Sequence, residues 1–254
     1  MDTKRNVQEQ FGKYANRYVT STTHVTGEDL PMMVDWLQPH KTDKVLDIAT
    51  GGGHVARTLA PLVKSVVISD LTKPMLHAAS TYLKAHENVD AVVADAEELP
   101  FLDESFDSVT CRIAAHHFPN PEQFIQEVAR VLKKGGAFIL IDNVSSEHHE
   151  IADFYNTFEK KRDYSHQRAL PISEWKSLMK HSHLQIQKQS LRKKTLSFNE
   201  WVSRMIDDEF EREGIHQMMV GADQKVKEYY EMKVEENRLM SFAIDEWMVL
   251  CTKE

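Results

Sequence analysis

The stretch Asp47-Ile48-Ala49-Thr50-Gly51-Gly52-Gly53 decides the fold. The apolar run 44–49 that leads into it predicts a short strand, and apolar residues at helical spacing follow it over 55–63. The glycines between strand and helix predict a tight turn, whose backbone can approach a ligand where side chains would collide. The segment therefore predicts the opening of a βαβ unit that binds a nucleoside-containing ligand.

The alternation of strand and helix continues after this loop. The pattern predicts strands over 65–69, 91–94, 108–111 and 137–141, and helices over 74–84 and 122–132. Farther along we expect helices over 151–164 and 173–180, and strands over 184–190 and 242–251. Strands separated by helices in this order predict an α/β fold, with a Rossmann-like, doubly wound, mostly parallel sheet covered on both faces.

Composition and charge exclude several classes of protein. The net charge of −8 argues against nucleic acid as a partner, since such binding needs a concentrated basic surface. We expect the one basic cluster, Arg192-Lys193-Lys194, to be a solvated strand end. Cys111 and Cys251 each lie in a predicted strand and should be buried thiols. With neither a signal sequence nor an apolar window long enough to span a membrane, the chain is expected to be soluble and cytoplasmic.

The glycine loop alone leaves two classes of cofactor open. Gly51, Gly53 and Ala56 satisfy the spacing G-x-G-x-x-[GA] of nicotinamide and flavin enzymes, and S-adenosylmethionine enzymes use a similar loop. Asp70 follows the next strand, where a carboxylate can accept hydrogen bonds from both ribose hydroxyls in either class. Asp70 could instead cap the helix that follows it.

Four further motifs carry a family resemblance. After the loop come Asp70, then Asp95-Ala96-Glu97-Glu98-Leu99-Pro100-Phe101, then Ser105-Phe106-Asp107, and then Arg130-Val131-Leu132-Lys133-Lys134-Gly135-Gly136. In this order they resemble the motifs of class I methyltransferases, and most of all the ubiquinone and menaquinone biosynthesis C-methyltransferase group. The resemblance covers roughly residues 11–142. It implies transfer of a methyl group from S-adenosylmethionine to a small-molecule acceptor by in-line displacement, with S-adenosylhomocysteine as product.

The resemblance also implies the arrangement of the chain. The sheet should be mostly parallel with an antiparallel last strand. Residues 1–43 should form an N-terminal helical lid, 44–196 with 239–254 the core, and 197–238 a helical cap insertion, all within a single compact domain. In the insertion, Ser197 and Glu200 predict a capping box ahead of Trp201, and a second helix is expected over 226–238.

The resemblance further implies roles for individual residues. Asp47 would lie near the amino group of the cofactor, and Asp70 would bind the ribose hydroxyls. Contacts to the methionine and ribose parts are expected from Ala49, Gly51, Gly53 and Arg112, and contacts to the adenine from Asp95 and Ala96. Further contacts to the cofactor are expected from Leu71, Met75 and Glu97, and from three residues of the lid, Tyr14, Arg17 and Tyr18. Ala49 replaces the first glycine of the commonest motif, so a positive φ is less accessible there.

The acceptor side is less constrained by the sequence. His117 follows the fourth strand at the carboxyl edge of the sheet and is the candidate catalytic acid or base; the adjacent His116 shares this position. The histidines show no metal-like spacing, so no metal is expected. Seven apolar residues of the insertion could either wall the methyl group or simply pack the insertion: Trp201, Met205, Phe210, Met218, Met219, Tyr229 and Tyr230.

Two other functions stay open, a non-enzymatic S-adenosylmethionine-binding protein and a nicotinamide-dependent oxidoreductase. The sequence also leaves open the identity of the acceptor, whether carbon, oxygen or nitrogen is methylated, and the oligomeric state.

Overall fold

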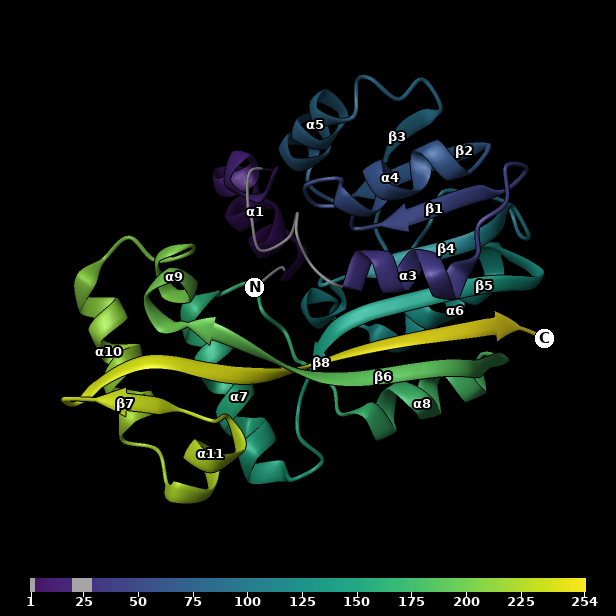
Figure 1. Ribbon diagram of the computed structural model, residues 1–254. Coiled ribbons are helices and arrows are strands. Elements are labelled where there is room, and N and C mark those ends of the chain that lie inside the picture. Colours follow the sequence, from purple (N-terminus) through teal and green to yellow (C-terminus); the bar gives the residue numbers. More distant parts are fainter. Residues whose placement is uncertain (1–2, 20–28) are drawn as a thin grey trace.

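A computed structural model describes residues 3–19 and 29–254, with the side chains of 13–19 left out of the description. One twisted sheet runs through the molecule, with the strand order β3-β2-β1-β4-β5-β8-β6 and β7 paired to β8 (Figure 1). The strands are β1 (Lys44–Ile48), β2 (Ser65–Asp70), β3 (Val89–Val93), β4 (Phe106–Arg112), β5 (Leu132–Val144), β6 (Leu184–Ser197), β7 (Lys233–Glu235) and β8 (Arg238–Lys253).

Strands β1 to β5 are parallel to one another, and β8 runs antiparallel to both β5 and β6. The prediction of a mostly parallel Rossmann-like sheet with an antiparallel last strand is therefore confirmed. Strand β1 lies at the centre of the parallel part, with all of its residues after Lys44 buried. Its near-continuous apolar character follows from helices on both faces.

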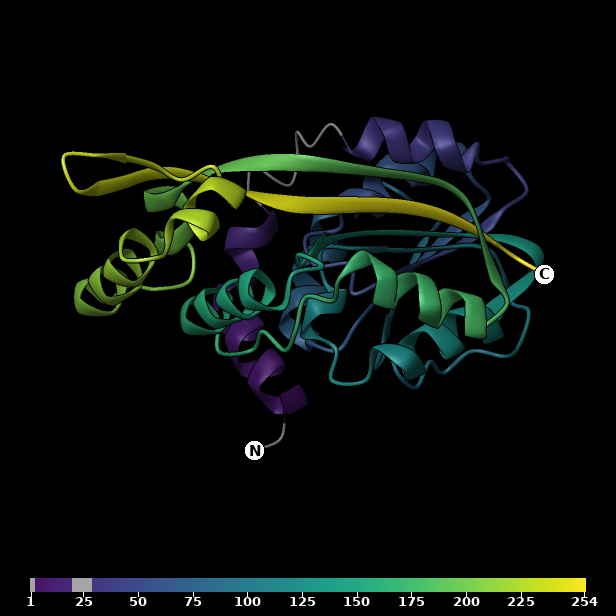
Figure 2. The same cartoon turned by 90° about the horizontal axis from the view of Figure 1, so that it is seen from below.

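Two layers of helices cover the sheet (Figure 2). On one face, α3 (Asp29–Leu37), α4 (His54–Leu59) and α5 (Lys73–Tyr82) contribute Met33, Leu59 and Leu76 to a buried core. On the other face, α6 (Pro121–Val131) and α8 (Ile172–His181) contribute Phe124 and Trp175 to a second core. Helix α1 (Thr3–Val19) packs beside α5, above the carboxyl edge of the parallel strands.

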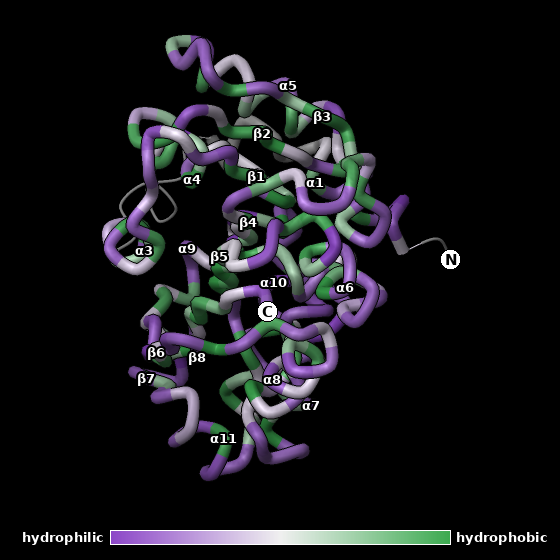
Figure 3. The backbone as a smooth tube through the Cα atoms, turned by 90° about the vertical axis from the view of Figure 1, so that its right-hand side faces the viewer, coloured by the Kyte–Doolittle hydropathy of each residue, from purple (hydrophilic) through white to green (hydrophobic). Residues whose placement is uncertain are grey.

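Strands β6 and β8 extend beyond the rest of the sheet and carry a third core at their far end (Figures 1 and 2). Around this end lie α7 (His149–Arg162), α9 (Phe198–Ser203), α10 (Glu209–Val220) and α11 (Gln224–Tyr229). Figure 3 shows that β6 is hydrophilic whereas its neighbour β8 is hydrophobic. The difference follows from position, because β6 is an edge strand and β8 lies between β5 and β6.

The structure corrects the predicted elements of the insertion. The helix expected over 226–238 ends at Tyr229, and the chain turns back at Glu236 and Asn237, whose φ angles are 47° and 62°, to form the hairpin of β7 and β8. Asparagine tolerates this left-handed conformation, which suits the hairpin turn, and Glu231, with a φ of 46°, already departs from helical geometry just after Tyr229. The capping box is also wrong, since Ser197 precedes α9 without a capping hydrogen bond from its side chain.

The basic cluster on β6 is the second correction. Arg192 and Lys193 lie opposite Glu246 and Asp245 on β8, in the middle of the strand rather than at its end. Lys193 Nζ is 3.1 Å from an Asp245 carboxylate oxygen, and Lys194 Nζ is 3.0 Å from one of Glu246. The carboxylates that pair with this cluster are some 50 residues away in sequence, so local pattern gave no sign of them.

Candidate functional site

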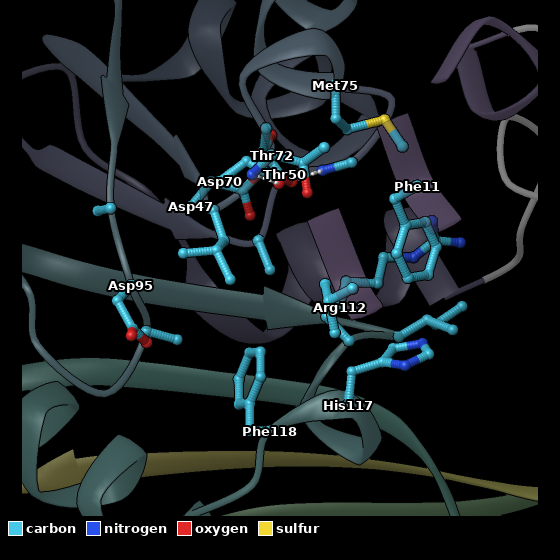
Figure 4. A pocket seen from close by; sticks show the side chains of 18 of the residues that line it. Phe11, Asp47, Thr50, Asp70, Thr72, Met75, Asp95, Arg112, His117 and Phe118 are labelled. Carbon is cyan, nitrogen blue, oxygen red and sulfur yellow. Dashed lines mark hydrogen bonds between the residues drawn. The ribbon is translucent and has the colours of Figure 1, made fainter. Parts of the chain in front are cut away.

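A cavity of about 1040 Å³, counting the part open to solvent, lies at the carboxyl ends of β1, β2 and β4 (Figure 4). Eleven predicted site residues line it: Asp47, Ala49, Gly51, Asp70, Leu71, Met75, Asp95, Ala96, Glu97, Arg112 and His117. The side chains of Tyr14, Arg17 and Tyr18 fall outside the part of the chain that the structure describes. Asp95 lies on one side of the cavity, and His117 and Phe11 lie together on the other (Figure 4).

The glycine loop turns sharply through three residues with positive φ. Ala49, Gly51 and Gly53 have φ angles of 51°, 55° and 80°. Ala49 therefore adopts the conformation that its side chain disfavours, at a strain of about 1 kcal/mol. Gly53 packs against α5, where an added Cβ would lie 3.0 Å from Leu83 Cδ1. Gly53 thus shapes the turn beside the cavity, and its predicted cofactor contact stays a prediction.

Asp47 is buried at the end of β1 and held by two hydroxyls. The hydroxyls of Thr50 and Thr110 donate to its carboxylate oxygens over 2.6 and 2.9 Å. Burial raises the pKa of Asp47 to about 6, against the opposing effect of these hydrogen bonds and of Arg112. Burial makes the ionised carboxylate of Asp47 less favourable, and a cationic group that binds beside it would stabilise it.

Asp70, at the end of β2, links the loop to the helix that follows. One carboxylate oxygen accepts from the backbone N–H of Gly51 over 3.2 Å, and the other accepts from that of Thr72 over 2.8 Å. Burial raises the pKa of Asp70 to about 6 as well. Thr72, not Asp70, is the residue that precedes the first turn of α5, so Asp70 does not occupy the capping position.

The loop after β3 meets a lysine of α1. Lys4 Nζ lies 2.5 Å from a carboxylate oxygen of Asp95, which is predicted to contact the adenine, and 2.7 Å from one of Glu97, another predicted cofactor-binding residue. The sequence did not mark Lys4 as a site residue, because its role depends on the way α1 folds back over the sheet.

Arg112, at the end of β4, pairs with Asp29 of α3, and both side chains are buried. The next residue, Ile113, has a φ of 53°, an uncommon conformation for a β-branched side chain. Strain of this kind concentrates at functional sites. Ile113 lines the cavity and also a second, smaller one beside it.

The second cavity measures about 650 Å³, again counting the part open to solvent, and shares Phe11, Ile113 and His117 with the first. The edge of the Phe11 ring meets the His117 ring, with the centroids 5.0 Å apart. His117 Nδ1 lies 3.3 Å from the hydroxyl oxygen of Ser165, which in turn donates to Asp163 over 2.5 Å. The other ring nitrogen of His117, Nε2, lies 4.0 Å from a carboxylate oxygen of the same Asp163.

The pKa values of the two adjacent histidines are shifted in opposite directions. Burial, reinforced by the neighbouring His116, lowers the pKa of His117 to about 4. Burial also disfavours the charged form of His116, but Asp142, which lies 2.6 Å from its Nδ1, outweighs that effect and raises the pKa. At neutral pH, His117 is therefore the uncharged ring that faces both cavities.

Comparison with known proteins identifies the family. The profile described as "Methyltransferase domain" matches residues 46–140. The uncharacterized methyltransferase YcgJ of Bacillus subtilis is 38% identical over 199 residues, which cover 76% of this chain and 78% of that protein. The chain belongs to the class I methyltransferase family. A methyltransferase structure from Bacillus halodurans superposes with a TM-score of 0.87 at 38% identity, covering 89% of this chain and 99% of that one.

A quinone methyltransferase is also similar to part of this methyltransferase. The ubiquinone/menaquinone biosynthesis C-methyltransferase of Rickettsia typhi is 35% identical over 129 residues, 47% of this chain and 52% of that protein. Membership of the family excludes the nicotinamide alternative and confirms the resemblance of the ordered motifs. The cofactor of the methyltransferase is S-adenosylmethionine.

The polar groups of the first cavity fit this cofactor. Carboxylates at Asp47, Asp70 and Asp95 suit its ammonium, ribose hydroxyls and adenine amine, whereas the guanidinium of Arg112 suits its carboxylate. The loop also leaves room, since a Cβ at Gly51 would meet only the backbone oxygen of Ala49, at 4.0 Å. The individual contacts remain predictions.

The apolar residues of the insertion serve the third core of the methyltransferase. Trp201, Met205, Met219 and Tyr230 are buried there, and Phe210 is 88% exposed. None of the seven candidates for an apolar wall lines the first cavity, and Trp201 lines the second. Packing of the insertion is thus the interpretation that the structure supports.

Among the described residues, no helix is long and apolar enough to cross a membrane.

Proposed function

We propose that the chain transfers the methyl group of S-adenosylmethionine to a small molecule that occupies the second cavity and reaches the methyl group past His117. When bound, the cofactor supplies a methyl group activated by its sulfonium. The observation that carries the proposal is the wall of Phe11, Ile113 and His117, which both cavities share. An acceptor in the second cavity would therefore lie next to a cofactor in the first, where these three side chains border both cavities.

The residues around the wall would orient the acceptor and exclude water. Phe11 and Ile113 are apolar, and orientation of two reactants can supply about 7 kcal/mol of a barrier in favourable cases. The uncharged ring of His117 has one nitrogen lone pair, which can accept a proton or a hydrogen bond from an acceptor hydroxyl, amine or carbon acid. Ser165 and Asp163 would hold this ring in position.

A small molecule, rather than a macromolecule, is favoured by the size and the charge of the site. The second cavity is bounded by side chains of α1, α7, α9, β6 and β8, and the chain carries a net charge of −8. These features suit a compact acceptor better than a nucleic acid.

The proposal is tested in two steps. Calorimetry with S-adenosylhomocysteine should give a saturable isotherm. Methyl-labelled S-adenosylmethionine is then incubated with panels of small acids, phenols, amines and quinols, and separately with RNA and protein. We expect label in the small-molecule panel. Binding without transfer to any panel would support a non-enzymatic binding protein instead, and label only in RNA or protein would exclude a small-molecule acceptor.

A further inference from the structure

Asp29 and Arg112 form a buried ion pair, of which Arg112 lines the first cavity. Arg112 Nη2 donates to one Asp29 oxygen over 3.1 Å, and Arg112 Nε donates to the other in a second, shorter contact. Their side chains are 7% and 3% exposed. A planar guanidinium bound through two nitrogens to one carboxylate has little freedom to rotate. The pair therefore fixes the direction in which Arg112 presents its remaining hydrogen-bond donors.

Asp29 also contacts a group of charged side chains on β6 and β8. Arg192 Nη2 lies 3.4 Å from an Asp29 oxygen, and Arg192 Nε donates to Glu246 over 2.6 Å. Lys194 Nζ donates to the same Glu246 over 3.0 Å. Among the described residues, Asp29 therefore links Arg112 to the charged side chains of β6 and β8, and Arg112 is the member of this group that lines the first cavity. A buried guanidinium is stabilised when an anion enters beside it.

The other charges of the cavity indicate which anion this is. Asp47 lies close enough to Arg112 for the guanidinium to lower the pKa of that carboxyl, against the larger effect of burial. Lys4, also cationic, is at the other side and is paired with Asp95 and Glu97. A carboxylate and a guanidinium side by side match the ammonium and the carboxylate of an amino acid.

We propose that Asp29 is a positioning residue, which holds Arg112 in place for the carboxylate of the cofactor's amino-acid part. This inference rests on the proposed function, because it takes S-adenosylmethionine as the ligand. In this role Asp29 acts through Arg112, because Arg112 lines the first cavity and Asp29 is not among the described residues that line it.

Two ligands separate positioning from a general structural role. S-adenosylhomocysteine has the amino-acid part, and 5′-methylthioadenosine has the same adenosine and sulfur without it. In Asp29→Asn, calorimetry should show about tenfold weaker binding of S-adenosylhomocysteine, and binding of methylthioadenosine within about twofold of wild type. In an Arg112→Gln background, adding Asp29→Asn should change neither affinity further.

A matched control lies on the same strand. Asp107→Asn removes the carboxylate that pairs with Lys133 near the start of β4, at the opposite end from Arg112, and should leave both affinities unchanged. If Asp29→Asn does not fold, Asp29→Glu retains the charge but moves the carboxylate by one methylene group, and it should show the same selective loss. An equal loss for both ligands, or no loss, overturns the proposal. Wild-type protein that binds neither ligand refutes the proposed function itself.

Discussion

Replacing Asp47 with asparagine tests whether the cofactor loop gives up stability for ligand binding. Burial raises the pKa of Asp47 from 3.8 to about 6, so the ionised carboxylate is less favourable in the folded chain than in the unfolded one. A shift of about 2 pH units corresponds to about 3 kcal/mol. Asparagine has no charge, and its amide can still bond both threonine hydroxyls, which donate or accept. We expect Asp47→Asn to raise the free energy of unfolding by up to about 3 kcal/mol at about pH 8.

The pH dependence gives the prediction its sign. The penalty grows as pH rises from 3.8 through about 6, and is complete above that value, because only then is the folded carboxyl ionised. Urea unfolding of both proteins without ligand, followed by circular dichroism at about pH 8 and about pH 4, should show the difference at the higher pH and its disappearance at the lower. Binding of S-adenosylhomocysteine should fall by more than about tenfold.

Asp107→Asn is a control for which the opposite change in the free energy of unfolding is expected. Partial burial alone would raise the pKa of Asp107, but the hydrogen bonds from Lys133 and from the backbone N–H of Lys44, together with the charge of Lys133, outweigh burial and lower that pKa. Its replacement should therefore lower, not raise, the free energy of unfolding at about pH 8. The reasoning about Asp47 is refuted if Asp47→Asn is no more stable than wild type at the higher pH, or if the difference between them is the same at both values.

Three further predictions concern the two cavities. Asp70→Ala should weaken S-adenosylhomocysteine binding by more than about tenfold, because an acceptor for two hydroxyls is lost; an unchanged dissociation constant in the folded variant would remove Asp70 from the ribose site. His117→Gln should bind S-adenosylhomocysteine within about twofold of wild type but transfer label to the identified acceptor about a hundredfold more slowly, and full activity would exclude His117 as acid or base. Lys4→Met should bind S-adenosylhomocysteine about threefold more tightly, since Asp95 and Glu97 no longer engage the lysine, whereas weaker binding would mean that Lys4 itself assists the ligand.

The parallel half of the fold could be predicted because its signals are local. The loop Asp47–Gly53 and the apolar runs on both sides of it fixed the positions of β1 and α4, and the following strands fell within a few residues of the expected ranges. The insertion was harder to predict. Helix α11 ends at Tyr229, and Glu231, just after it, has a φ of 46°, but the helical spacing of apolar residues continues past this point.

The same distinction between local and long-range signals applies to the candidate site. Residues within the ordered motifs could be assigned by their place, and seven of them line one cavity together with four other predicted residues. Lys4, Asp29 and Asp163 could not, because each acts through a partner that is distant in sequence and meets it only after the sheet has formed. The positive φ of Ile113 could not be predicted either, because β-branched residues rarely adopt this conformation.

The separate core at the far end of β6 and β8 bears on how relatives of this methyltransferase can diverge. Residues 198–232 pack mainly on α7 and on the outer parts of these two strands, while the glycine loop is stabilised by cores on the other side of the molecule. Substitutions around Trp201 can therefore reshape the wall of the second cavity without disturbing the glycine turn that lines the first. One donor site can in this way be combined with many acceptors, as mutation remodels one end of a shared pair of strands.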